Sequence, residues 1–389
     1  MRLVVTEEQE ELRGALRRFF ADKSPGAEVR RLMESATGYE PAVWKQMAEQ
    51  LGLQGLAVPE EYGGSGFGVR ELVIVLEEMG RALVCAPYFA TVVLAATALQ
   101  ASDDKTAQRD LLPGIADGTT IATLAWTENE RWDLGAVVMT ARETADGWVL
   151  DGTKTYVLDG HIADLVLVAA RTPLGLSLFA VDGDITGSTS RGGTTPHTPR
   201  SGSAAGLTRT ALPVLDQTRK LARLDFAAVP ARLVGTEGGA EPVLAHTLDI
   251  AAVGLAAEQL GGAQVSLDMA VEYAKVRHQF GRPIGGFQAI KHRCADMFVQ
   301  VESARSAVLQ AAATADEDPG ELPVAAALAK AFCSDAYFHT AAESIQIHGG
   351  IGFTWEHDAH LYFKRAKSSQ ELFGAPAHHR NRLAHLVGI

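Results

Sequence analysis

The sequence predicts an α+β protein: an N-terminal helical domain, a middle β-barrel or sandwich domain and a C-terminal four-helix bundle. Two observations carry this prediction. Apolar residues recur at intervals of three and four up to about residue 118 and again after residue 236, as in amphipathic helices. Between these segments the period falls to two, in short runs of β-forming residues. We therefore expect domains at residues 1–118, 119–235 and 236–389.

The composition excludes several classes of function. The 389 residues carry a net charge of -12 without a basic run, so no nucleic-acid partner is expected. The three cysteines are widely spaced among apolar residues, which predicts buried reduced thiols and no metal site. The N-terminus lacks a signal-peptide core, and Pro87 and Gln100 interrupt the uncharged run 83–102, which we interpret as a buried helix. We expect a cytoplasmic protein without a membrane partner.

The first domain is expected to be helical because its apolar spacing agrees with the positions of residues that begin and end helices. Thr6 and Gln9 have the spacing of a capping box that opens a helix through about Phe20. Further helices are predicted over residues 44–51, 69–83 and 104–118.

Six short runs in the middle domain are predicted strands. They are residues 121–126, 136–142, 148–156, 165–170, 176–181 and 207–213. Asp146-Gly147 and Asp151-Gly152 are expected to be hairpin turns. Residues 186–205 are rich in Gly, Ser, Thr and Pro, which predicts a flexible surface insertion; a functional lid is the less favoured alternative.

The last domain is predicted to contain three long helices and two shorter ones. Small residues crowd the stretch 246–276, which predicts a central bundle helix or a subunit contact, because small side chains let helices approach closely. The other helices are expected over residues 287–308, 321–348, 357–373 and 376–386.

A turn within residues 273–297 joins the first two of these helices and carries Arg277, Gln279 and Phe280. A permanent cation, an amide and an aromatic face are the groups that a dinucleotide diphosphate and its rings would contact. A simple helix–turn–helix corner with a surface arginine would have the same residues, and chemistry alone favours that interpretation.

Five motifs give the chain a resemblance to the acyl-CoA dehydrogenase family. They are P-E-E-Y-G-G at 59–64, W-T-E at 126–128, D-G-T-K-T-Y-V-L-D-G at 151–160, R-H-Q-F-G-R-P-I-x-x-F-Q at 277–288 and Q-I-H-G-G-I-G-F at 346–353. Each motif is weak alone, but their order and spacing cover the whole chain except the insertion at 186–205.

The resemblance implies that FAD is the cofactor. It implies that a carboxylate removes the α-proton of an acyl-CoA thioester while the β-hydrogen leaves as hydride to flavin N5. It also implies a tetramer, in which the flavin ring lies on the β domain of one subunit and the diphosphate reaches the bundle of its neighbour, and an electron-transfer acceptor. On this pattern the cofactor-binding residues are Arg277, Gln279, Phe280, Gln346, Gly349 and Gly350 at the diphosphate, and Thr127 at the ring edge.

The chain departs from the family pattern at the catalytic base. Phe373 and Ala251 occupy the two positions at which relatives carry it, and neither side chain accepts a proton. No catalytic residue is therefore assigned. Asp249 and Glu371 stand two residues earlier, about 200° away around a helix, so we expect both to be solvated charges facing away from the site.

The flavin-ring pattern is altered as well. The family's P-G-A-G-S-D becomes residues 129–133 without Gly or Ser, and Tyr156 and Leu158 replace a Trp and a Thr. Leu158 removes a hydrogen-bond donor near flavin N5. The usual Arg-Asp-Ala before the base segment is Lys-Arg-Ala at 364–366.

These losses favour one hypothesis over two others. The first is the base-lacking subunit of a two-subunit acyl-CoA dehydrogenase, a class that includes enzymes of bulky sterol-side-chain CoA thioesters; it would lend its intact diphosphate half to a homologous partner in a heterotetramer. The second is a self-sufficient homotetramer with a displaced carboxylate base. The third is a non-catalytic protein that binds a CoA ester or a partner, because fold does not fix function.

Overall fold

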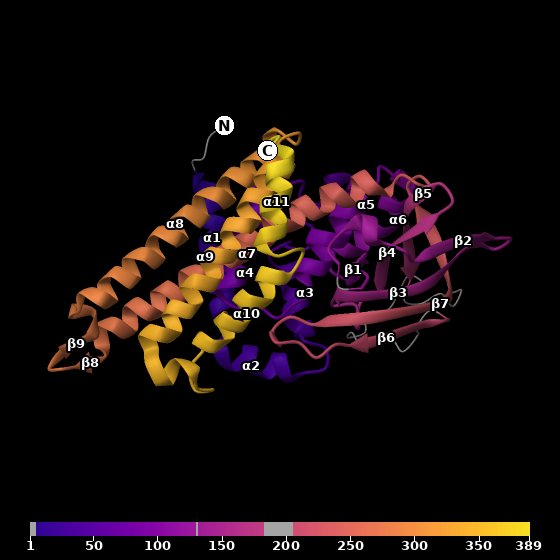
Figure 1. Cartoon of the computed structure of the whole chain (residues 1–389). Helices are drawn as coiled ribbons and strands as arrows, with labels where there is room; N and C mark the ends of the chain where they lie inside the picture. Colours follow the sequence, from indigo (N-terminus) through magenta and orange to yellow (C-terminus); the bar gives the residue numbers. More distant parts are fainter. Residues whose placement is uncertain (1–4, 130, 183–204) are drawn as a thin grey trace. The chain divides into compact units, whose positions relative to one another are not determined.

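The computed structural model describes residues 5–129, 131–182 and 205–389, and Figure 1 shows its helices and strands. They form two compact units. The first unit comprises residues 1–31, 68–84 and 249–389, and the second comprises residues 32–67 and 85–248. Except for its last residue, the insertion expected at 186–205 lies outside the described residues.

The N-terminal helices confirm the predicted capping box. The backbone N–H of Gln9 donates to Thr6 Oγ1 at 3.2 Å, and the backbone N–H of Thr6 donates to Gln9 Oε1 at 3.1 Å. The helices are α1 (Glu7–Lys23), α2 (Gly26–Glu34), α3 (Pro41–Glu49), α4 (Val69–Arg81), a π-helix (Phe89–Ala96), α5 (Thr97–Ala101) and α6 (Lys105–Ala116), with a 3-10 turn at Glu60–Tyr62. The run 83–102 is thus helical from residue 88 to residue 101, and the π-helix within it is buried.

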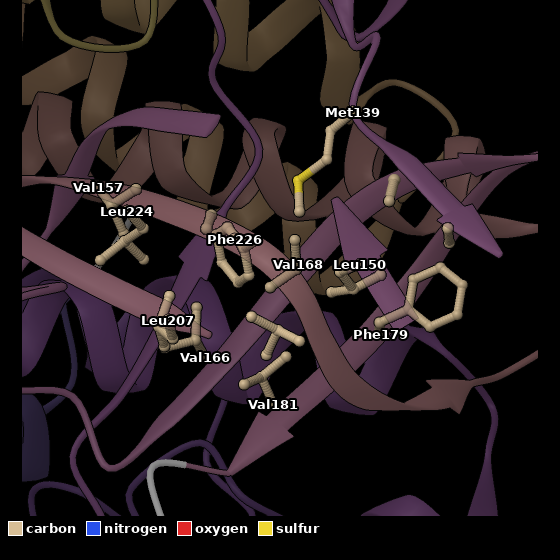
Figure 2. Packing of buried hydrophobic residues seen from close by; sticks show 14 of the residues in the cluster. Met139, Leu150, Val157, Val166, Val168, Phe179, Val181, Leu207, Leu224 and Phe226 are labelled. Atoms are coloured by element: carbon tan, nitrogen blue, oxygen red, sulfur yellow. The ribbon is translucent and has the colours of Figure 1, made fainter. Parts of the chain in front are cut away.

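The β domain is a closed barrel. Its strands are β1 (Ala122–Ala125), β2 (Thr140–Thr144), β3 (Gly147–Leu158), β4 (Leu165–Thr172), β5 (Gly175–Asp182), β6 (Leu207–Ala211) and β7 (Leu221–Val234), with a 3-10 turn at Leu134–Ala136. Pairing runs from β4 through β2, β3, β7 and β5 and returns to β4, while β1 flanks β4 and β6 flanks β7. Apolar side chains such as Val166, Val168, Phe179 and Phe226 fill this ring, as Figure 2 shows.

One predicted turn is wrong. Thr144 pairs with Gly147, so the first Asp-Gly lies at the β2–β3 hairpin as expected. The second, Asp151-Gly152, lies inside β3, where the register against β7 shifts between Leu150 and Gly152 and Gly152 has φ 145°. A strand irregularity and a tight turn demand the same permissive residues, which is why the sequence signal did not separate them.

The C-terminal helices form a bundle in which α9 contacts α8, α10 and α11. The elements are α7 (Ala240–Val276), β8 (His278–Gln279), β9 (Arg282–Pro283), α8 (Gln288–Glu317), α9 (Leu322–His348), α10 (Ala359–Glu371) and α11 (Pro376–Leu386), with 3-10 turns at Ile284–Gly286 and Gly349–Phe353. α7 is long and apolar enough to cross a membrane, but 78% of its most apolar window is buried in the protein, as in a core helix.

The small residues of α7 serve contacts within this unit. A Cβ added to Gly261 would lie 1.9 Å from the carbonyl O of Glu77 on α4, and one added to Gly80 would lie 2.1 Å from the carbonyl O of Glu258. The α4 and α7 backbones therefore touch, which only glycine permits. Among the cysteines, Cys85 and Cys333 are buried free thiols as expected, whereas Cys294 is only half-buried.

We expect Gly261→Val to destabilise the protein by about 3 kcal/mol, the upper end of overpacking costs, because a backbone oxygen cannot move aside like a side chain. The matched control is Gly14→Ala on α1, where a Cβ would meet only Arg18 at 3.5 Å. That change should stabilise by up to about 1 kcal/mol through helix propensity. Urea unfolding followed by circular dichroism measures both; a small effect of Gly261→Val would contradict the α4–α7 contact.

Candidate functional site

The turn after α7 is a two-residue β-hairpin rather than a plain corner. Gln279 on β8 pairs with Arg282 on β9, and the backbone N–H of Ile284 donates to the carbonyl O of Arg277 at 2.8 Å. The two residues at the tip, Phe280 and Gly281, have φ 52° and 78°. Positive φ at both positions is the signature of the hairpin turns that match strand twist. Phe280 is held in this conformation with its side chain 92% exposed.

The second half of the predicted diphosphate site lies at the end of α9. Gly349 ends the helix with φ 64°, and a Cβ built on Gly349 or Gly350 would meet no atom within 4 Å. The ring of His348 lies 4.5 Å from the ring of Tyr273, one turn before Arg277. This contact brings the ends of α7 and α9 together, so both halves of the site lie at one end of the bundle (Figure 1).

The site faces solvent in the single chain. Arg277, Gln279, Phe280, Gln346, Gly349 and Gly350 are all exposed. Large apolar side chains at the same end are exposed too, namely Val276, Ile351, Phe353 and Trp355. A cation, two amides and two open glycines at a helix end fit an FAD diphosphate, because they offer charge-assisted hydrogen bonds and close backbone approach. The surrounding apolar rim is typical of an interaction surface.

Both predicted base positions are apolar and buried. Ala251 lies inside α7, and Phe373 stands on the turn after α10 with φ 61°. His379 Nε2 donates to the carbonyl O of Phe373 at 3.0 Å. The ammonium of Lys330 on α9 donates to the carbonyl O atoms of Ser369 and Gly374, at 3.1 and 3.3 Å. The turn at the base position is thus tied to the bundle by two buried side chains.

Neither neighbouring carboxylate is placed as a base. Glu371 is a surface charge as expected: its side chain is 54% exposed and lies 2.6 Å from Lys367 Nζ. Asp249, however, is not solvated. Its side chain is 4% exposed, and both carboxylate oxygens accept from Arg382, with Nη2 at 3.0 Å from Oδ2. The sequence prediction failed here because Arg382 lies 133 residues away along the chain.

The altered Lys-Arg-Ala segment also has a structural role that the sequence did not reveal. Arg365 on α10 is buried and pairs with Glu258 on α7, which is also buried. Lys364 instead extends over the ring of Trp355, with Nζ 4.5 Å from the ring centroid. Losing one partner of a buried ion pair leaves an uncompensated charge, so Arg365 and Glu258 fix α10 against α7.

In the β domain, Thr127 and Leu158 at the predicted flavin-ring site are buried. Glu128, which follows Thr127, is buried, and its carboxylate lies 2.5 Å from the ammonium of Lys154 on β3. Both residues belong to motifs of the family resemblance, but the sequence did not predict that they form an ion pair. Burial lowers the pKa of Lys154 to about 8, although the Glu128 carboxylate opposes this shift.

The order of helical, β and helical domains, and an exposed bundle end whose residues fit an FAD diphosphate, are the features expected of a flavin-dependent oxidoreductase. Three family models match the chain: the acyl-CoA dehydrogenase N-terminal domain at residues 6–119, the middle domain at 123–208 and the C-terminal domain at 239–387. The chain belongs to the acyl-CoA dehydrogenase family, and FAD is its cofactor.

Similar proteins span the full length of the chain. Acyl-CoA dehydrogenase IpdE2 of Mycobacterium tuberculosis is 37% identical over 383 residues, which cover 97% of this chain and 96% of the relative. A solved variant of the Tcur3481-Tcur3483 steroid ACAD is 33% identical with a TM-score of 0.86 and covers 99% of both chains. The ChsE4-ChsE5 complex from Mycobacterium tuberculosis is 29% identical with a TM-score of 0.86 and covers 100% of this chain and 99% of that chain.

The turn at Phe373 is held by a lysine with a displaced pKa. Burial lowers the pKa of Lys330 to about 7, although Glu371 and Asp335 oppose the shift. A lowered pKa means that between about pH 7 and pH 10.5 the unfolded chain binds more protons at this lysine than the folded chain. Stability therefore rises with pH from about 7 to 10.5, and below about pH 7, where the lysine is protonated in both states, its contribution no longer changes with pH.

We expect wild type to gain on the order of 2 kcal/mol of stability relative to Lys330→Met between pH 7.5 and pH 9.5. The control is Lys367→Met on α10, whose side chain is 43% exposed. Its difference from wild type should stay constant over the same range. Urea unfolding at the two pH values measures this, and a pH-independent difference for Lys330→Met would refute the assignment.

Proposed function

We propose that this chain is the base-lacking subunit of an FAD-dependent acyl-CoA dehydrogenase that introduces an α,β double bond into an acyl-CoA thioester. It forms a heterotetramer with a homologous partner that carries the base and the flavin-ring site. One observation carries this proposal: the diphosphate residues, Arg277 foremost, are exposed at the end of the bundle, while apolar, buried side chains occupy both base positions.

In this assembly the chain's own residues bind and orient. Arg277 offers a planar, permanently charged fork to a diphosphate oxygen pair, and Gln279 adds an amide donor from the hairpin. Phe280 would pack on a ring of the bound cofactor, and Gly350 would let the backbone approach the cofactor closely. The exposed aromatic side chains around them exclude water once a neighbour covers this end. FAD, when bound, supplies the hydride acceptor.

The comparisons support the hetero-oligomer and a bulky substrate. Two of the similar structures are named for pairs of proteins, and one of these is a steroid ACAD. We therefore infer a large polycyclic acyl-CoA as substrate. Reduced flavin must be reoxidised in each turnover, so an electron-transfer acceptor completes the set of partners. We place the reaction in the cytoplasm.

The alternatives are less well supported. A displaced base would need an uncommitted carboxylate near Phe373 or Ala251, but Arg382 engages both oxygens of Asp249 and Glu371 points to solvent beside Lys367. A protein without chemistry is disfavoured by membership of a family of dehydrogenases.

Co-expression tests the central claim. We expect the chain purified alone to be colourless, and the chain purified with its homologous partner to show flavin absorbance near 450 nm that bleaches on addition of acyl-CoA. The physical reason is that only the partner supplies the base and the ring site. A flavin-loaded homotetramer of this chain alone that desaturates acyl-CoA would refute the proposal.

Arg277→Ala tests whether this chain supplies the diphosphate half of the FAD site. We expect the assembled enzyme to bind FAD about 10- to 100-fold more weakly, the loss that corresponds to charge-assisted hydrogen bonds. The control is Arg18→Ala, which removes an exposed arginine on α1 and should leave FAD binding unchanged. Flavin retained after gel filtration, and its dissociation constant from fluorescence, measure the effect; equal affinities for the two variants would place the diphosphate elsewhere.

A further inference from the structure

A buried carboxylate ties down the loop that departs most from the family pattern. Glu128 accepts hydrogen bonds from the backbone N–H of Val138 at 2.8 Å and of Met139 at 3.1 Å, and from Lys154 Nζ at 2.5 Å. The segment that leaves the barrel after Glu128 therefore returns to the same carboxylate ten residues later. The two ends of the loop are therefore joined at one buried carboxylate that is itself paired with Lys154 on β3, and losing either partner of this pair would leave a buried charge uncompensated.

Trp132 on this loop packs against Tyr156, the residue at the predicted flavin-ring position. The rings of Trp132 and Tyr156 stack with centroids 6.2 Å apart and an interplanar angle of 27°. Trp132 also lies 5.7 Å from the ring of Trp126 at the start of the loop. Trp132 thus contacts both Trp126, directly after β1, and Tyr156, within β3.

The backbone of β3 turns Tyr156 out of the regular pleat. The register of β3 against β7 shifts between Lys154 and Val157, and Tyr156 within this shift has φ 53°. A bulky residue in the left-handed region is uncommon and persists only where its surroundings hold it. Strand bulges often re-aim a side chain in this way. Here the ring of Tyr156, displaced by the register shift, stacks with Trp132.

We propose that Trp132, in an offset stack against Tyr156, closes this chain's own β domain to a flavin ring. The residues here do not fit an isoalloxazine: the ring of Tyr156 is already stacked, and Leu158 is buried and offers no donor. This inference rests on the proposed function and deepens it, because the heterotetramer then binds one FAD for each pair of unlike chains.

The purified full-length chain, titrated with lumiflavin and followed by flavin fluorescence, tests the closure directly. Lumiflavin carries the ring without the diphosphate, so the exposed end of the bundle does not contribute. We expect Trp132→Gly to bind lumiflavin about tenfold more tightly than wild type, the factor that corresponds to a stacked aromatic pair. Trp132→Phe keeps a ring over Tyr156 and should bind like wild type. The matched control Phe298→Ala removes an exposed aromatic ring on α8, in the other unit, and should leave the affinity for lumiflavin unchanged.

Equal lumiflavin affinities for wild type and a folded Trp132→Gly variant would overturn the closure. If circular dichroism shows that Trp132→Gly does not fold, the flavin count of the wild-type heterotetramer decides: two FAD per tetramer supports the closure and four overturns it. A failure of the proposed function is a different result, namely substrate-dependent flavin reduction by this chain without a partner.

Discussion

The contact between the backbones of α4 and α7 is the constraint on which the first unit depends. Gly80 and Gly261 let the two helices touch, and this fixes the position of α7 in the core. Along its length α7 contacts α10, α11 and the end of α9. Glu258 pairs with Arg365 on α10, Asp249 pairs with Arg382 on α11, and the ring of Tyr273 packs on His348 at the end of α9. The hairpin that carries Arg277 is the direct continuation of this helix.

Charges are buried in pairs where the family pattern is lost. Buried Asp249 pairs with the partly exposed Arg382, buried Glu258 pairs with buried Arg365, and Glu128 pairs with Lys154 on the strand of the predicted ring site. Such pairs add little net stability compared with apolar packing, but removing one partner is costly. These ion pairs therefore fix the relative positions of the elements that carry them. On the proposed function, these pairs hold the surroundings of the predicted base and ring positions in place although the family's chemical groups are replaced.

The sequence predicted the features that depend on local spacing. The capping box at Thr6, the helix that ends at Gly349 and the order of domains follow from neighbours within a few residues. It missed features set by distant partners. The strand β7 and the pairing of Asp249 depend on residues far away along the chain, and the bulge at Gly152 shares its composition with a turn. The positive φ of Phe280 was also missed, because phenylalanine gives no signal for that conformation.

The exposed aromatic end of the bundle has a consequence for the life of the chain in a cell. Phe280, Phe353 and Trp355 expose large apolar side chains to water. Exposed apolar patches on an unassembled protein promote aggregation. We therefore expect a copy without a neighbour over this end to be recognised by chaperones and proteases. On the proposed assembly, the amount of this protein that a cell can keep is limited by the amount of the partner that covers this end.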